Sequence, residues 1–276
     1  MENLKGLLGK YGIQLKKAFG QNFLTDESLL LRIVSKAGVT KNTTVLEIGP
    51  GAGALTRELA KQAKKVISYE IDTRLKPVLQ EVVGEYDNVE IVFKDIMKEK
   101  IVELEKKLGD EYILVANLPY YITTPIIMLF LEKAKNIKSL VVMVQQEVAE
   151  RFSAKPSNTD YGAITVGINL RGCSSVIEYV PRQMFTPPPN VDSAVVKIDV
   201  DNTKFEGVDL SKVREVVRIG FSSRRKMLIN NLMNFYKIDR SKAESLLNSA
   251  NLPLTCRAEN LSAEDFVRLS KVIGEI

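Results

Sequence analysis

The residues best suited to chemistry in this chain are Asn117, Leu118, Pro119 and Tyr120, which follow a short apolar run. Pro119 fixes its own φ and favours an extended Leu118, so the Leu118 carbonyl can lie beside the Asn117 side chain. Two acceptors beside an aromatic ring suit a planar exocyclic amine such as that of adenine, held for in-line attack on a methyl group. Tyr120 would stack on a base taken out of its own stack. The alternative is a proline-containing loop with a buried tyrosine.

A glycine-rich turn offers a second site, for a nucleotide-type cofactor. Gly49, Gly51 and Gly53 lie between the apolar run 45–48 and an apolar-periodic helix. Glycines permit positive φ and close approach of a ligand, and a helix start presents free N–H groups. A dinucleotide site expects the third glycine one residue later, so the spacing disfavours hydride transfer. Simple tight packing at this strand-to-helix turn is the alternative interpretation.

Two acids end the next two predicted strands. Glu70 lies about 20 residues past the glycine turn, where an acid can accept hydrogen bonds from ribose hydroxyls. Asp95 ends the following strand and would lie at the same edge of the sheet. Either carboxylate alone could instead cap a helix. Together with the glycines, the two acids favour a nucleoside pocket.

A parallel sheet is needed to bring these residues together. Short runs rich in valine and isoleucine alternate with helical patterns from residue 44 onward, which predicts an α/β fold with helices on both faces of the sheet. Because ligands of such sheets lie at the carboxyl ends of the strands, the motifs should meet there. The expected strands are 44–48, 65–70, 89–93, 112–116, 138–145, 175–179 and 193–200. The expected helices among them are 26–37, 54–63, 73–83, 99–108 and 123–134.

The pattern becomes purely helical after residue 204. We therefore expect two domains: residues 1–204, with the sheet and an N-terminal arm, and residues 205–276, a small all-α domain. Helices of the second domain are expected near 209–220, 224–236, 240–249 and 263–274.

Composition excludes several kinds of chemistry. The chain has 276 residues and no histidine, so Ser-His-Asp catalysis and histidine-ligated metals are excluded. Cys173 and Cys256 lack metal-ligand spacing, and no metal is expected. With no apolar run of about 18 residues, we expect a soluble cytoplasmic protein with no membrane partner. A monomer is expected.

The net charge of +5 favours a polyanionic partner. Basic residues cluster before and within the second predicted helix of the C-terminal domain, where they would neutralise RNA phosphates and make binding salt-dependent. A solvated helix face is the alternative, and the loop 155–162 is a further candidate contact whose composition indicates only an exposed loop. The predicted RNA-binding residues are Arg218, Arg224, Arg225 and Lys226, with Lys212 and Arg214 nearby.

Four motifs together resemble a known family over nearly the whole chain. They are Gln-Asn-Phe-Leu at 21–24, Glu-Ile-Gly-Pro-Gly-Ala-Gly at 47–53, Asn-Leu-Pro-Tyr at 117–120, and Phe-Thr-Pro-Pro-Pro-Asn-Val-Asp-Ser-Ala-Val-Val at 185–196. The family is that of the ribosomal small-subunit RNA adenine N6-dimethyltransferases, the KsgA/RsmA family. The resemblance implies a Rossmann-like methyltransferase sheet that uses S-adenosylmethionine.

Further site residues are implied by this resemblance. S-adenosylmethionine would be held by Asn22, Leu24, Gly49, Glu70, Asp95 and Asn117. The arm with Gln21 and Asn22 would close over the cofactor, whereas a frayed terminus is the alternative. Gly51 and Gly53 complete the predicted cofactor set. Family members place two methyl groups on each of two adjacent adenosines in the 3′-terminal hairpin loop of small-subunit (16S) rRNA, a step linked to small-subunit biogenesis.

Phe185 precedes three successive prolines, which stiffen the chain and cannot join a sheet ladder. We hypothesise that the target base stacks between Tyr120 and Phe185. The alternative is a rigid connection with a core phenylalanine.

Two other functions compete with this prediction. One is a macrolide-resistance type of adenine N6-methyltransferase, which acts on large-subunit rRNA. The other is a non-catalytic RNA-binding or assembly factor on the same scaffold. The Phe-Thr-Pro-Pro-Pro segment and the helical tail favour the small-subunit enzyme, and the intact 117–120 segment favours activity.

Overall fold

The computed structural model describes residues 4–13, 22–24 and 26–274. The chain divides into two compact units, one of residues 1–149 with 175–200 and one of residues 150–174 with 201–276. The predicted division after residue 204 differs from this mainly over residues 150–174, which the sequence pattern placed with the sheet.

Among the residues described, the first unit is built on a seven-stranded sheet in the order β4-β3-β2-β5-β6-β9-β7. The strands β2 to β6 pair in parallel, and β9 runs antiparallel to β6. The order reverses between β2 and β5, where doubly wound sheets bind their ligands. The strand bounds are β2 Thr44–Ile48, β3 Lys65–Glu70, β4 Val89–Phe93, β5 Tyr112–Ala116, β6 Ile137–Gln145, β7 Gly172–Val180 and β9 Ser193–Val200.

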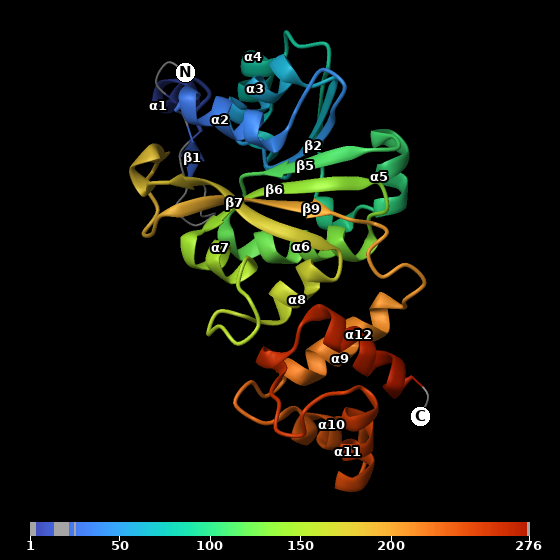
Figure 1. Ribbon diagram of the computed structural model, residues 1–276. Coiled ribbons are helices and arrows are strands. Elements are labelled where there is room, and N and C mark those ends of the chain that lie inside the picture. Colours follow the sequence, from blue (N-terminus) through green and yellow to red (C-terminus); the bar gives the residue numbers. More distant parts are fainter. Residues whose placement is uncertain (1–3, 14–21, 25, 275–276) are drawn as a thin grey trace. The chain divides into compact units, whose positions relative to one another are not determined.

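Helices cover both faces of this sheet, as predicted. Figure 1 shows α2, α3 and α4 on one side and α6 on the other. Asp26 caps α2 by accepting from the Leu29 N–H at 2.8 Å, and Gly38 ends it at φ 79°. The predicted α/β fold class is thereby confirmed. The helix bounds are α2 Glu27–Ala37, α3 Ala54–Gln62, α4 Lys76–Val83, α5 Ile101–Leu108, α6 Tyr120–Lys133 and α7 Gln146–Phe152.

The N-terminal arm contains two elements that the sequence pattern did not predict. Helix α1 (Leu4–Lys10) buries Leu4 and Leu8 in one apolar cluster with residues of α4. Strand β1 (Phe23–Leu24) pairs antiparallel with β8 (Phe185–Thr186), so that Leu24 lies opposite Phe185. The segments 22–24 and 185–186, which are distant in sequence, therefore lie side by side.

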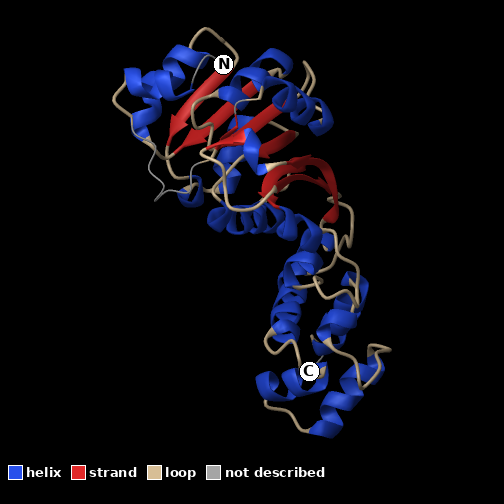
Figure 2. Cartoon of the chain, turned by 90° about the vertical axis from the view of Figure 1, so that its left-hand side faces the viewer, coloured by secondary structure: helices blue, strands red, loops and turns tan. Residues whose placement is uncertain are grey.

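The second unit consists of helices joined by loops, seen in Figure 2. The fully buried Tyr161 packs with its ring centroid 6.4 Å from that of Phe221 and donates its hydroxyl to the Leu261 carbonyl at 2.8 Å. Val166 of α8 and Leu170, the residue that follows this helix, enter the same core, which explains why residues 150–174 belong to this unit. The helices are α8 Ala163–Asn169, α9 Leu210–Phe221, α10 Leu228–Tyr236, α11 Arg240–Ser249 and α12 Ala263–Ile273.

Among the helices described in both units, none is long and apolar enough to span a membrane.

Candidate functional site

A cavity of about 830 Å³ lies at the carboxyl ends of the parallel strands, within the first unit. It brings together most of the residues predicted for cofactor and base. Those in its lining are Asn22, Leu24, Gly49, Gly51, Glu70, Asp95, Asn117, Leu118, Pro119, Tyr120 and Phe185. Gln21 lies outside the described residues.

The glycine turn packs directly against the Asn-Leu-Pro-Tyr segment. Gly49 adopts φ 75° and donates its N–H to the Tyr69 carbonyl at 2.9 Å. A Cβ at position 49 would lie 2.8 Å from Leu118 Cδ2, closer than such atoms approach. The glycine at position 49 therefore takes its positive φ without strain and leaves room for the Leu118 side chain beside the turn.

The other two glycines make different contacts. A Cβ on Gly51 would lie 3.1 Å from the Phe23 ring, so the N-terminal arm packs over the turn. Gly53 is not in the cavity lining, and a Cβ there would lie 3.1 Å from Val82 Cγ1, on α4. Gly53 thus serves the packing of α3 against α4, which was the alternative interpretation of the glycine pattern. Phe23 was missed as a contact of the turn because its partner lies 28 residues away.

Glu70 links β3 to the glycine turn. Its side chain is 5% exposed, its Oε2 accepts from the Gly51 N–H at 3.2 Å, and its Oε1 accepts from the Asp72 N–H at 2.8 Å. Burial raises the pKa of this carboxyl, and these two backbone hydrogen bonds oppose the rise. Each carboxylate oxygen has further acceptor capacity for a ligand hydroxyl.

Asp95 both caps a short helix and lines the cavity, which are the two roles that the sequence allowed for it. Its Oδ1 accepts from the Met97 N–H at 3.0 Å and caps the short 3₁₀ helix Ile96–Lys98. The same residue lines the cavity. Capping fixes the carboxylate at the edge where a ligand would meet it.

Tyr120 is held in place by a partner that the sequence could not indicate. Its hydroxyl lies 2.7 Å from Ser193 Oγ, at the first residue of β9. Burial raises the pKa of the Tyr120 phenol, and the Ser193 hydrogen bond opposes this rise. Pro119 adopts φ −53° and lies at the N-cap position of α6, so Tyr120 is the first residue of that helix. The ring orientation is therefore fixed from both ends.

Phe185 lines the cavity but is only 3% exposed. It packs in the apolar cluster that contains Leu24 and Leu29. Phe185 is therefore both a core residue and a cavity residue, two roles that the sequence analysis treated as alternatives. Tyr121, also in the lining, is 74% exposed, and the sequence pattern gave no signal for it beyond its place after Tyr120.

A buried acid precedes the glycine turn. Glu47 is 1% exposed, and its Oε2 accepts from Ser68 Oγ at 2.5 Å. Burial raises the pKa of Glu47 to about 7. The sequence motif contained Glu47 but assigned it no role, because strand patterns do not show which polar side chain faces the interior.

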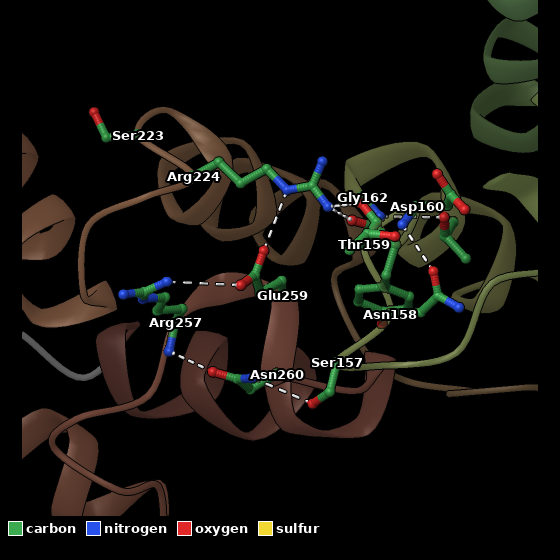
Figure 3. Close-up of polar contacts among 12 residues, drawn as sticks. Ser157, Asn158, Thr159, Asp160, Gly162, Ser223, Arg224, Arg257, Glu259 and Asn260 are labelled. Atoms are coloured by element: carbon green, nitrogen blue, oxygen red, sulfur yellow. Dashed lines mark hydrogen bonds and ion pairs between the residues drawn. The ribbon is translucent and has the colours of Figure 1, made fainter.

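The predicted RNA-binding residues belong to the second unit. Arg218, Arg225 and Lys226 are exposed. Arg224 is also exposed, but its guanidinium is bonded to Glu259 and to the loop carbonyls of Thr159 and Tyr161 (Figure 3). In the described part of the chain, no group of three or more cysteine, aspartate or glutamate side chains could hold a metal ion.

The sheet order, the antiparallel β9, the glycine turn and the acid ending β3 define a Rossmann-like methyltransferase. The model of the family described as ribosomal RNA adenine dimethylase matches residues 12–275. The chain belongs to that family, which confirms the prediction from its motifs.

Relatives extend over nearly the full chain. A protein of Bacillus licheniformis named ribosomal RNA small subunit methyltransferase A is 44% identical over 99% of this chain and 96% of its own. The protein of the same name from Clostridioides difficile is 41% identical over 98% of this chain and 94% of its own.

Solved structures agree with the fold. A dimethyladenosine transferase from Plasmodium falciparum has a TM-score of 0.76 and 27% identity, covering 90% of this chain and 95% of that one. The 23S rRNA methyltransferase ErmE has a TM-score of 0.69 and 30% identity, covering 92% of this chain and 100% of that one.

Proposed function

We propose that this protein transfers methyl groups from S-adenosylmethionine to N6 of two adjacent adenosines in the 3′-terminal hairpin loop of small-subunit rRNA. The observation that carries the proposal is the packing of Gly49 against Leu118, because it joins the cofactor turn and the amine-binding segment in one cavity. Relatives named small subunit methyltransferase A support the choice of substrate. The protein would act in the cytoplasm, as a monomer, on immature small subunits.

The cavity fits the proposed methyl donor. Its volume of about 830 Å³ suits a nucleoside-sized ligand. When bound, S-adenosylmethionine supplies a methyl group on a positively charged sulfur. Gly49 and Gly51 would leave room for it, Glu70 would accept from ribose hydroxyls, and Asp95 would accept at the same edge. Asn22 and Leu24 would close the site from the arm, joined by Gln21.

The base site relies on positioning rather than on a titrating base, since the chain has no histidine. The Asn117 side-chain oxygen and the Leu118 carbonyl would accept the two N–H groups of the adenine amine and direct its lone pair toward the methyl group. Tyr120, fixed by Ser193, would stack on the extruded base, and Phe185 would close the other side. Such preorganised acceptors need no reorganisation during the reaction.

Exposed basic residues of the second unit would bind RNA phosphates. Arg218, Arg225 and Lys226 are free to face solvent, and the net charge of +5 would favour encounter with a polyanion.

The substrate is tested by mapping labelled methyl groups after incubation with unmethylated small or large ribosomal subunits. We expect two dimethylated adenosines in the small-subunit RNA. Methyl groups on large-subunit RNA would instead support a macrolide-resistance type of activity. Binding to small subunits without any methyl transfer would support a non-catalytic assembly factor.

The base site is tested by Asn117→Ala. We expect methyl transfer to fall by about 10²- to 10³-fold, as when one preorganised polar group of an active site is removed. The thermal unfolding temperature should stay close to that of wild type, which shows that the fold is retained. Asn248→Ala, which changes an exposed asparagine of α11, is the matched control. Unchanged transfer in Asn117→Ala would contradict the proposed mechanism.

A further inference from the structure

Arg224 lies in the basic cluster, yet its guanidinium is engaged within the protein. Its Nε lies 3.2 Å from Glu259 Oε2. Its Nη2 donates to the Tyr161 carbonyl at 3.1 Å and to the Thr159 carbonyl (Figure 3). Arginine offers five donors in a rigid planar fork, and here the fork spans a carboxylate and two backbone carbonyls. This geometry is that of a clamp on the loop.

The segment clamped by Arg224 is the loop Ser157–Tyr161. A second set of bonds ties it to the turn 257–261: the Ser157 N–H donates to the Glu259 carbonyl at 2.7 Å, and Asn260 Nδ2 donates to Ser157 Oγ at 3.2 Å. The buried Tyr161 anchors the far end of the loop through its bond to Leu261. The backbone of the loop is thus fixed, whereas the side chains of residues 157–160 are exposed.

The clamped loop forms one side of a second cavity, of about 330 Å³. Three arginines line it against one acid, so its charge is positive. Because Glu259 is paired with Arg224, the positive charge left for a ligand comes mainly from Arg225 and Arg257, both exposed. Arg257 Nη1 lies 3.9 Å from Glu259 Oε1, at the outer limit of an ion pair. The lining is Ser157, Asn158, Thr159, Arg224, Arg225, Arg257 and Glu259.

We propose that Arg224 is a positioning residue, which with Glu259 holds the loop Ser157–Tyr161 as one wall of a phosphate-binding cavity for RNA. The loop contributes exposed polar side chains, and Arg225 and Arg257 contribute the charge. This inference rests on the proposed function for its ligand, but the clamp itself does not. Arg224 and Arg225 are neighbours of the same type, yet they have different roles.

A substitution that keeps the positive charge but removes the planar guanidinium distinguishes a positioning role of Arg224 from a role as a charge that binds phosphate. Lysine keeps the positive charge of Arg224 but cannot reach the carboxylate and both carbonyls in one plane. In Arg224→Lys, amide hydrogen exchange of Ser157 and Tyr161 in the free full-length protein should accelerate by about tenfold or more, as expected when a charge-assisted hydrogen bond is lost. Its affinity for unmethylated small ribosomal subunits should fall as far as that of Arg224→Ala.

The matched controls are Arg225→Lys and Arg225→Ala. Neither should alter exchange in the loop. Arg225→Lys should nearly keep the affinity, whereas Arg225→Ala should weaken binding and reduce the slope of log affinity against log salt by about 1, as for one lost phosphate contact. Glu259→Gln provides a second way to loosen the clamp if Arg224 variants fail to fold.

The proposal is overturned if Arg224→Lys exchanges and binds like wild type, because Arg224 would then act only as a charge. It is also overturned if the loop exchanges faster while RNA affinity is unchanged, since the loop would then be no part of the binding wall. If the wild-type protein fails to bind small subunits, the proposed function fails, and the exchange measurement alone still decides whether Arg224 is the clamp.

Discussion

Glu47 should make the stability of this protein depend on pH in a defined interval. The side chain is 1% exposed, and one of its oxygens accepts from Ser68. Hydrogen bonds from Ser68 and Thr56 lower its pKa, but burial outweighs them. Burial raises its pKa from 4.5 to about 7, and the charge of nearby Glu70 adds to the rise. The folded state therefore holds the Glu47 proton at pH values where the unfolded chain has lost it.

The direction follows from linkage. Below pH 4.5 both states are protonated at Glu47, and the stabilising effect of the buried neutral carboxyl is fully present. As pH rises from 4.5 to about 7, the unfolded state gains by ionising and the free energy of unfolding falls. At about 1.4 kcal/mol for each pH unit between the two pKa values, the loss is about 3 kcal/mol.

Urea unfolding at pH values from about 5 to 8 measures this loss. In Glu47→Gln the side-chain oxygen can still accept from Ser68, but nothing ionises at position 47. The part of the fall in unfolding free energy due to Glu47 should therefore be absent, leaving only the contribution of other groups such as Glu70, whose pKa burial also raises. Since the chain has no histidine, no histidine titration is superimposed on this interval. Ser68→Ala removes a bond that lowers the pKa of Glu47, so the fall should extend to higher pH. Parallel profiles for wild type and Glu47→Gln would refute the reasoning.

Two further substitutions test the site. Gly49→Ala should lower the free energy of unfolding by about 1–3 kcal/mol because of the positive φ, and by a further amount because the new Cβ would lie 2.8 Å from Leu118. Gly207→Ala is the control, since Gly207 has φ 76° but open space around it. If urea unfolding gave equal losses for the two variants, the Leu118 contact would contribute nothing. Phe185→Ala should cost about 3–5 kcal/mol of stability because the ring is buried, and should sharply lower methylation with cofactor affinity nearly intact. Phe185→Leu keeps the packing without the ring, and its full methylation activity would contradict stacking.

The sheet could be predicted closely because its central strands are buried on both faces. β2, β3 and β5 are short, mostly apolar and largely buried strands. β4 lies at the sheet edge and is half-buried, but it is rich in valine and isoleucine. The observed bounds of all four strands are those expected from the sequence. Once the sheet is parallel, the carboxyl-end rule alone places Gly49 and Asn117 at one edge. The contact between Gly49 and Leu118 could not be predicted from the sequence, because it depends on how far β2 and β5 extend beside each other.

The missed features depend on partners distant in sequence. The pairing of Leu24 with Phe185 involves strands of two residues, too short to show any periodicity. Tyr161 lies at the end of a polar loop, and only the helices that cover it reveal it as a core residue. The basic cluster gave Arg224 and Arg225 equal weight, because charge patterns do not show that Glu259 pairs with Arg224.

The assignment of residues 150–174 to the helical unit has a consequence for how the protein can be divided. This unit is discontinuous in sequence, since residues 175–200 belong to the sheet unit. A fragment ending at residue 204 would retain Tyr161, Val166 and Leu170 without the helices that bury them. Its exposed apolar surface would favour aggregation. A fragment beginning at residue 205 would lack three of its own core side chains. Neither fragment therefore contains a complete unit. The core of the helical unit can be completed only when residues 150–174 and residues 201–276 are both present, with the sheet residues 175–200 between them in sequence.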